Sequence, residues 1–381
     1  DVTATDEWLA LLALPVILVG AFLLLEDPPV SRLVRAGLLV AAMIPVLPML
    51  QLFPVPAGIW NWSPARDAIA DELAAVGGAT RHAWTLWPEA TERALYALLP
   101  AMACFLGALA LGMRGRRVLV PLALALVLAN LVFGFFQVGL PPDSPMRLYT
   151  DNGTGFGGVL VNGNHQGTAL IVGMLLSLGL WARQRRQLRQ GRAPQPLKNA
   201  AFATAALACL ASVPLTGSSG AMLIALGALV AALLTSGLLD PRRLRRSRIA
   251  MAGGVGLLAV AALGLFAASG WLDFKRADAQ RYGLAQDVLA AGTTHAPFGS
   301  GAGTFVDSFA QSGSPSLGMS ELINHAHNEY AQWWFEAGWP GIALLLAALV
   351  LLASTGWRLI RARPRDPVAI VCWLAVCAML V

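Results

Sequence analysis

Charged residues are scarce in this chain. Only 13% of its 381 residues are charged and 57% are hydrophobic, whereas a soluble globular domain carries about 25% charged residues. The mean hydropathy is +0.63. This composition argues against a soluble protein and predicts an all-α, polytopic integral membrane protein.

Ionisable residues are also nearly absent from the middle of the apolar runs. Carriers that couple transport to protons or ions usually place such groups there, so their absence argues against a secondary transporter. The cysteines lie in apolar runs without CxxC or Cys/His spacing, and we expect packing residues that say nothing about the redox compartment. They are Cys104, Cys209, Cys372 and Cys377.

What the chain does contain is a series of apolar runs. Ten of them approach the roughly 20 residues that cross a bilayer, and we predict ten transmembrane helices. The runs lie near 9–25, 33–53, 94–112, 118–140, 158–181, 199–214, 219–239, 249–270, 328–355 and 368–381. The chain begins at Asp1 and stops inside an apolar run at Val381, so we expect both termini to be truncated.

Basic residues are concentrated in every second loop between these runs. Five such loops hold 20 of the 27 Lys and Arg residues: 26–35, 113–117, 182–198, 240–248 and 356–366. The positive-inside rule places these loops in the cytoplasm and places 54–93, 141–157 and 271–325 outside. We therefore interpret the net charge of +6 as a topology signal rather than a nucleic-acid-binding surface.

The outer segment 54–93 carries four tryptophans, Trp60, Trp62, Trp84 and Trp87. An interfacial aromatic belt explains them, and sugar stacking by a segment lying at the membrane surface is the alternative.

A first polar stretch on the outer side contains Asn162, Gly163, Asn164 and His165, at the start of a predicted helix. Backbone amides at a helix N-terminus favour an anion, and glycine allows close approach of a ligand. Tight helix packing explains the glycines equally simply. Either an anion or sugar site or a packing contact is therefore expected here.

The longest polar stretch runs from Trp271 to Glu321 and contains Arg281 and the motif Gly299-x-Gly301-x-Gly303. The motif lacks the preceding strand that a nucleotide-binding loop would need, and a tight turn is sufficient to explain it.

This stretch ends on His325-Ala326-His327-Asn328-Glu329, and Glu336 follows. Two histidines beside an amide and a carboxylate can bind and deprotonate a charged substrate. A capping or interface role is an equally open interpretation. The i, i+2 spacing of the histidines is not completed by a metal-binding motif, so no metal and no cofactor are expected. Ser218 and Ser219 lack the GxSxG spacing of a serine hydrolase.

Taken together, these motifs resemble a known family. The pattern runs from His327-Asn328-x-Tyr330 to Glu336-x-Gly338-x-x-Gly341, after Arg281 and Pro297-Phe298-Gly299-x-Gly301-x-Gly303. It resembles the core of the O-antigen ligase and Wzy-type polymerase superfamily, over roughly residues 94–381. The Asn162-x-Asn164-His165 stretch is similar to a second motif of its polymerase-like members.

The resemblance implies a GT-C-type helical bundle in the bacterial inner membrane, with its active site facing the periplasm. We expect a single membrane domain over 1–381, in which 271–327 is the periplasmic loop with the catalytic residues. The implied reaction moves a glycan, with inversion, from undecaprenyl diphosphate to an acceptor hydroxyl. Neither a nucleotide sugar nor a metal takes part. The polyprenyl tail of the donor would lie against membrane lipid.

The family also implies roles for particular residues. Arg281 would hold the diphosphate, and His327 would activate or orient the acceptor hydroxyl as general base. The substrate-binding residues would be Asn162, Asn164, His165, His325, Asn328 and Glu336.

Two positions depart from the family pattern. Ser219 stands where members commonly have an arginine, and Gly163 stands where polymerase-like members often have one. Arg147, Lys275 and Arg276 are the candidates for the missing phosphate contact.

The sequence does not determine the acceptor. Polymerisation of a surface polysaccharide is favoured slightly over ligation to lipid A-core, and protein O-glycosylation comes third. A flippase or exporter of lipid-linked glycan is the alternative from another class, and it would need no catalytic histidine.

Overall fold

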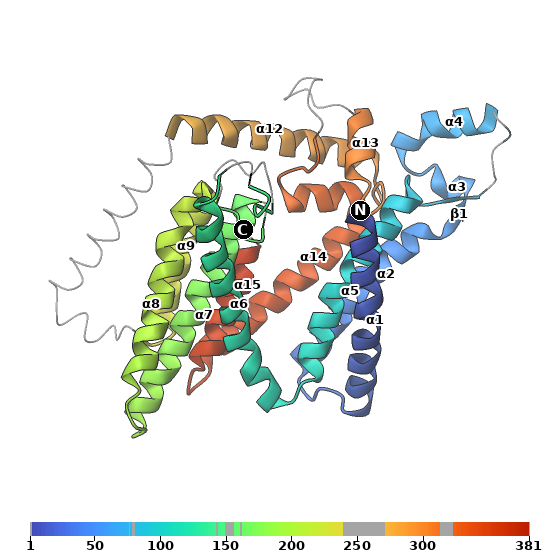
Figure 1. Ribbon diagram of the computed structural model, residues 1–381. Coiled ribbons are helices and arrows are strands. Elements are labelled where there is room, and N and C mark those ends of the chain that lie inside the picture. Colours follow the sequence, from blue (N-terminus) through green and yellow to red (C-terminus); the bar gives the residue numbers. More distant parts are fainter. Residues whose placement is uncertain are drawn as a thin grey trace. The chain divides into compact units, whose positions relative to one another are not determined.

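The computed structural model describes residues 2–75, 77, 81–141, 144–148, 156–160, 162–238, 271–312 and 323–380. These residues are mainly helical (Figure 1). They include seven helices that are long and apolar enough to cross a membrane, and two shorter apolar helices. The predicted all-α, polytopic membrane fold is confirmed. The predicted helix 249–270 and the basic loop 240–248 lie outside the described residues.

The chain forms two compact units, which we describe separately. Unit 1 comprises Asp1–Gly112 and Lys275–Leu351, and unit 2 comprises Met113–Phe274 and Leu352–Val381.

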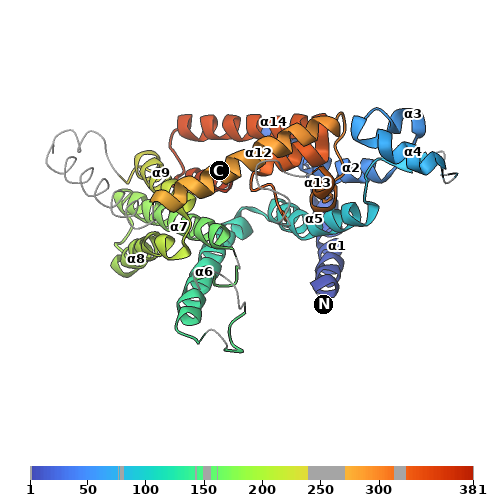
Figure 2. The same ribbon diagram turned by 90° about the horizontal axis from the view of Figure 1, so that it is seen from above.

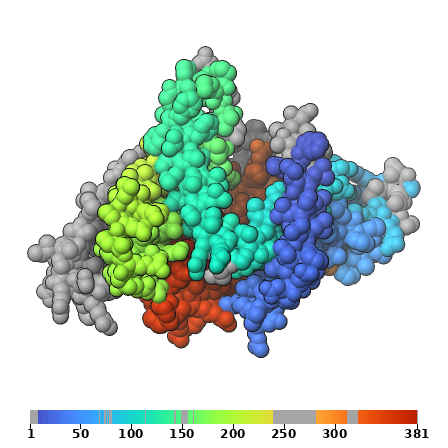
Figure 3. Space-filling model, turned by 60° about the horizontal axis from the view of Figure 1, so that its bottom comes forward, coloured from blue at the N-terminus to red at the C-terminus, as the bar shows by residue number. Residues whose placement is uncertain are grey.

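In unit 1, helix α5 (Pro88–Ala110) packs against α1 (Val2–Glu26) and α2 (Arg32–Leu52). Gly20 of α1 allows this packing, because a Cβ there would lie 3.2 Å from the backbone of Leu106 in α5. One side of α1 is open to the surroundings (Figure 3). Large leucines of this helix, such as Leu12 and Leu18, are exposed, as expected for a surface that faces lipid.

A small polar subdomain follows α2 in unit 1. Strands β1 (Pro54–Pro56) and β2 (Arg81–Ala83) form an antiparallel pair. The short helices between them are α3 (Ala57–Trp60), η1 (Pro64–Arg66) and α4 (Asp67–Ala75).

The remainder of unit 1 consists of α12 (Trp271–Thr294), α13 (Phe305–Ser312) and the first part of α14 (Glu329–Arg361). These three helices lie side by side in both ribbon views (Figures 1 and 2). They share an apolar core that includes Val288, Phe305, Phe309 and Phe335.

Unit 2 is built around α7 (Gly163–Arg189). It packs against α6 (Met113–Val138), α8 (Pro196–Ser212), α9 (Ser219–Thr235) and α15 (Pro367–Met379). The single turn η2 (Val213–Thr216) joins α8 to α9. Glycines on α7 let these helices approach closely. A Cβ at Gly173 would lie 2.9 Å from the Sγ of Cys209, and a Cβ at Gly179 would overlap Val371. Small residues at helix contacts are the usual means of close packing in membranes.

Candidate functional site

The Gly-x-Gly-x-Gly motif forms a tight turn, here called the glycine turn (Pro297–Gly303). Gly299, Gly301 and Gly303 have φ angles of 80°, 122° and 76°, which only glycine adopts without strain. Space also requires glycine. A Cβ at Gly299 would overlap the backbone of Glu336, and a Cβ at Gly301 would overlap the side chain of Thr85.

The glycine turn is bonded to α14 at a break in that helix. Gly338 has φ 57° and ψ −148°, and α14 changes direction there (Figure 1). Pro340 cannot donate to the carbonyl of Glu336, which would be its helical partner. That carbonyl instead accepts from Gly301 N at 3.0 Å, and Trp339 N donates to the carbonyl of Pro297 at 2.9 Å. At the break, backbone groups of α14 therefore form hydrogen bonds with the glycine turn instead of within the helix.

The side chain of Glu336 strengthens the same connection. One carboxylate oxygen accepts from Gly303 N at 2.9 Å and the other from Phe305 N at 3.2 Å. Gln332 also donates to it, at 3.3 Å. Glu336 is only 7% exposed. These contacts fit a positioning role for Glu336 better than direct substrate binding.

Sequence reasoning missed three further residues that hold the glycine turn. Gln51 donates to the carbonyls of Phe298 and Glu336 at 3.0 and 2.9 Å. Trp84 Nε1 donates to the carbonyl of Gly299 at 2.9 Å, and Arg66 donates to it at 3.4 Å. Two sequence features could have pointed to them: Gln51 ends an apolar run, and Arg66 lies inside a tryptophan-rich segment.

Arg66 is fully buried, and the Trp60 and Trp84 rings lie 4.8 and 4.0 Å from its guanidinium carbon. Burial lowers its pKa to about 9. Trp60 and Trp84 are therefore core residues of the subdomain, whereas Trp62 and Trp87 are exposed and can form an interfacial belt or stack on sugar.

His295 is a second buried, ionisable side chain beside the turn. Its ring packs edge-on against Phe335, with centroids 4.6 Å apart. Burial, followed by the charge of Arg66, lowers its pKa to about 4. His295 is therefore a neutral core residue near pH 7.

His327 has the opposite environment, because it is exposed and precedes α14. Its φ of 51° makes it the only non-glycine residue with positive φ in the described parts of the chain. Such a conformation costs about 1–3 kcal/mol, and strained residues of this kind cluster at functional sites. Partial burial, Arg281 and His325 lower the pKa of His327, and Glu329 opposes them. A neutral imidazole, which can accept a proton, is thereby favoured.

The residues on either side of His327 fix its position. Ala326 is fully buried in the core shared by α12, α13 and α14. Asn328 caps α14, because its Oδ1 accepts from Tyr330 N and Ala331 N at 3.1 and 3.0 Å. His327 is therefore held between a buried anchor and a helix cap.

Arg281 is brought toward His327 by the packing of α12. Leu284 and Val288, one and two turns further along α12, are buried against Phe305 and Phe335. Arg281 itself is exposed, as are His325 and Glu329. The charges of Arg281, His325 and Glu329 act on the pKa of His327, and these four residues are here called the histidine cluster. The cluster is exposed and carries two histidines beside a permanent cation.

The first polar stretch belongs to unit 2. Asn162 caps α7 by accepting from Asn164 N at 2.8 Å, and the Oδ1 of Asn164 accepts from the Ser218 hydroxyl at 2.6 Å. A Cβ at Gly163 would overlap the carbonyl of Thr216. Asn162 thus caps α7, Asn164 joins the start of α7 to the start of α9, and His165 is exposed.

Arg147, Lys275 and Arg276 are the predicted candidates for the missing phosphate contact. Arg147, in unit 2, donates to the carbonyl of Leu140 at 3.0 Å. The side chains of Lys275 and Arg276 lie outside the described residues. No group of three or more His, Cys, Asp or Glu residues that could hold a metal occurs in the described parts of the chain.

Comparisons with known proteins identify one family. Residues 203–346 match a family model described as O-antigen ligase. No curated protein and no solved structure matches the chain. The matched stretch includes Arg281, the glycine turn, His327 and Glu336, but it is shorter than the predicted 94–381 and does not reach Asn162. The predicted resemblance to the O-antigen ligase and Wzy-type polymerase superfamily is confirmed over residues 203–346.

Proposed function

We propose that this protein transfers a glycan from undecaprenyl diphosphate to an acceptor hydroxyl at the periplasmic face of the bacterial inner membrane. The O-antigen ligase domain supports a glycan-ligating membrane enzyme. The donor, the acceptor and the mechanism are part of the proposal.

The histidine cluster is the observation that carries this proposal. It places an exposed cation beside an exposed imidazole whose pKa is lowered, and the imidazole is held in a strained backbone conformation. A diphosphate leaving group needs cationic stabilisation, and an acceptor hydroxyl needs a base. The cluster offers both.

In the proposed reaction, the acceptor oxygen attacks the anomeric carbon on the face opposite the diphosphate. A bond forms between that oxygen and the carbon as the carbon–phosphate oxygen bond breaks, which inverts the configuration. His327 takes the proton of the hydroxyl. The electron pair of the broken bond leaves with undecaprenyl diphosphate, whose negative charge Arg281 stabilises.

The glycine turn and Glu336 would support this chemistry without taking part in it. The turn bonds to α14 between Phe335 and Trp339, roughly two to three helical turns after His327. The helix cap at Asn328 and the buried Ala326 complete the support. His325 and Asn328 remain proposed substrate contacts, since both side chains are exposed.

Polymerisation of a surface polysaccharide is our first choice of reaction, because the Asn162-x-Asn164-His165 stretch resembles a motif of the polymerase-like members. Ligation to lipid A-core and protein O-glycosylation use the same chemistry with a different acceptor. The product of the reaction distinguishes them.

Glycan transfer by the purified protein tests the proposal. Undecaprenyl diphosphate-linked oligosaccharide is incubated with each class of acceptor, with and without a chelator. His327→Ala and Arg281→Ala are expected to abolish transfer. His82→Ala and Arg93→Ala are matched controls from the same unit and should keep it. The chelator should have no effect on wild type.

The outcome also separates an enzyme from a flippase or exporter. Transfer at the wild-type rate by His327→Ala would overturn the mechanism. Binding of the lipid-linked donor without any product in wild type would favour the transport function.

A further inference from the structure

The ends of several helices in unit 2 surround a pocket that the glycan chemistry does not use. It lies where α7 and α9 end and where the connection from α14 to α15 passes. Its volume is about 350 Å³. The lining residues are Ala182, Arg185, Arg186, Arg189, Ser236, Gly237, Arg363, Pro364 and Arg365.

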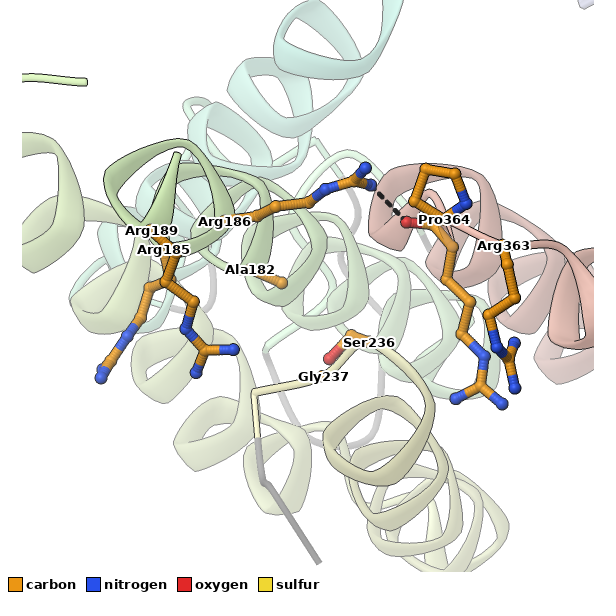
Figure 4. Close-up of a pocket in the computed structure, with 9 residues that line it drawn as sticks. Ala182, Arg185, Arg186, Arg189, Ser236, Gly237, Arg363 and Pro364 are labelled. Carbon is orange, nitrogen blue, oxygen red and sulfur yellow. Dashed lines mark hydrogen bonds between the residues drawn. The ribbon is translucent and has the colours of Figure 1, made fainter. Parts of the chain in front are cut away.

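Five of these nine lining residues are arginines, and none is acidic. Figure 4 shows Arg185 and Arg189 extending from α7 on one side of the pocket, and Arg363 on the other. Guanidinium groups that line one pocket repel one another unless an anion or solvent lies between them. A bound anion would offset this repulsion.

Part of the pocket is already fixed in position. Arg186 donates to the carbonyl of Arg365, across from α7 to the connection before α15 (Figure 4). Arg365 Nε donates to the carbonyl of Ile360 at 2.8 Å, and Arg363 Nη1 donates to the same carbonyl at 2.9 Å. These bonds use the free carbonyls at the end of α14. The Oγ of Ser236 is buried and has no hydrogen-bond partner among the described residues.

A second pocket of about 340 Å³ adjoins the first through Arg186. It is lined by further arginines, Arg116, Arg117 and Arg183. Asp366 is its acidic lining residue, and its Oδ1 accepts from Val368 N as the cap of α15. Two adjoining basic pockets provide places for two phosphate groups.

The position along α7 separates these pockets from the polar stretch of Asn162, Asn164 and His165. The 27 residues of α7 place Arg189 roughly 40 Å from Gly163, since an α-helix rises about 1.5 Å per residue. The basic loops 113–117, 182–198 and 356–366, which the positive-inside rule assigns to the cytoplasm, all contribute to this end of unit 2.

We propose that the two pockets bind the phosphate groups of an anionic phospholipid head group at the cytoplasmic surface of the membrane. Arginine forks bind phosphate with charge-assisted hydrogen bonds. Basic pockets between transmembrane helices on this side of a membrane suit anionic lipids. A head group with two phosphates, such as diphosphatidylglycerol, fills both pockets and binds more tightly than phosphatidylglycerol.

Thermal unfolding of the full chain in uncharged detergent tests this site. The double variant Arg185→Gln/Arg189→Gln removes two charges from the first pocket. The control Arg192→Gln/Lys198→Gln removes two charges from the same predicted cytoplasmic loop, at positions that do not line it. Each protein is titrated with diphosphatidylglycerol, phosphatidylglycerol, phosphatidylcholine or inorganic pyrophosphate.

Diphosphatidylglycerol is expected to raise the Tm of wild type and of the control, and phosphatidylcholine is not. The apparent lipid affinity of the Arg185/Arg189 variant should fall roughly tenfold or more. Arg185→Lys/Arg189→Lys, which keeps the charges, should recover part of this loss. Recovery in the lysine variant would show that the weaker lipid response of the glutamine variant does not come from misfolding.

Two results would overturn the proposal. An equal loss of affinity in both double variants would show that the loop attracts anionic lipid only by its net charge. Stabilisation by pyrophosphate at the same concentrations as lipid would identify a site for a soluble polyphosphate instead.

Discussion

At the scale of single residues, environment decides which histidine can act as a base. His295 and His327 both have a lowered pKa, but His295 is 4% exposed with its ring against Phe335, whereas His327 is exposed beside Arg281. Of these two histidines, only His327 is open to an acceptor from outside. The sequence identified His327 and Arg281 from their motif. It could not show the buried contacts of Glu336, because these depend on residues more than 30 positions earlier.

The charges around His327 predict opposite pKa changes for two substitutions. Arg281→Gln removes a cation and should raise the pKa of His327. Glu329→Gln removes an anion and should lower it. The pKa can be followed by NMR titration of histidine ring carbons, assigned by comparison with His327→Ala. A shift in the same direction for both variants would contradict the described cluster.

His295 predicts how stability depends on pH. Its pKa is about 4 in the folded protein and 6.5 ordinarily, so the unfolded chain binds more protons between these values. Stability should therefore fall as pH decreases from 6.5 to 4, by about 3 kcal/mol from this group. His295→Leu should show a shallower pH dependence of thermal unfolding than wild type. Parallel curves for wild type and His295→Leu would show that His295 does not remain neutral.

At the scale of elements, apolar runs located the membrane helices well but not their polar extensions. The run 158–181 predicted a helix that the structure has as Gly163–Arg189. The helix continues through 182–189 because arginine, glutamine and leucine all favour helix, although the first two are not apolar. Helix α12 was not predicted, since its 24 residues contain no apolar run. In the sequence, only Gly338 and Pro340 indicate the break in α14.

The glycine turn predicts unequal costs for two glycine substitutions. Gly301→Ala places a Cβ against Thr85 at φ 122°, and it should destabilise unit 1 by about 3 kcal/mol. Gly77→Ala, at φ 70° with open space around it, should cost only about 1 kcal/mol of backbone strain. Thermal unfolding of both variants measures the difference. Equal costs would mean that the turn is not packed as described.

At the scale of the whole molecule, the alternation of basic loops predicts the topology. In unit 2, three of the predicted cytoplasmic loops contribute to the same end of the helix bundle. Topology can be predicted this far from sequence because positive charge is costly to translocate. The pairing of distant polar residues within each unit cannot be predicted from sequence, because it depends on tertiary contacts rather than on local sequence pattern.

Cysteine accessibility tests this topology in intact cells. In a variant without the four native cysteines, Tyr282→Cys on the predicted periplasmic side should react with a maleimide that cannot cross the inner membrane. Gln190→Cys, after α7, should react only once that membrane is opened. Labelling of Gln190→Cys in intact cells would reverse the predicted orientation.

The central claim is that His327 performs chemistry rather than binding, and one comparison tests it most directly. Donor affinity and the single-turnover rate of glycan transfer are measured together for wild type, His327→Ala and His82→Ala. We predict that His327→Ala keeps donor affinity within about twofold of wild type while its transfer rate falls roughly 10²–10⁴-fold. His82→Ala should match wild type in both. A wild-type transfer rate in His327→Ala, or a loss confined to donor affinity, would contradict this account.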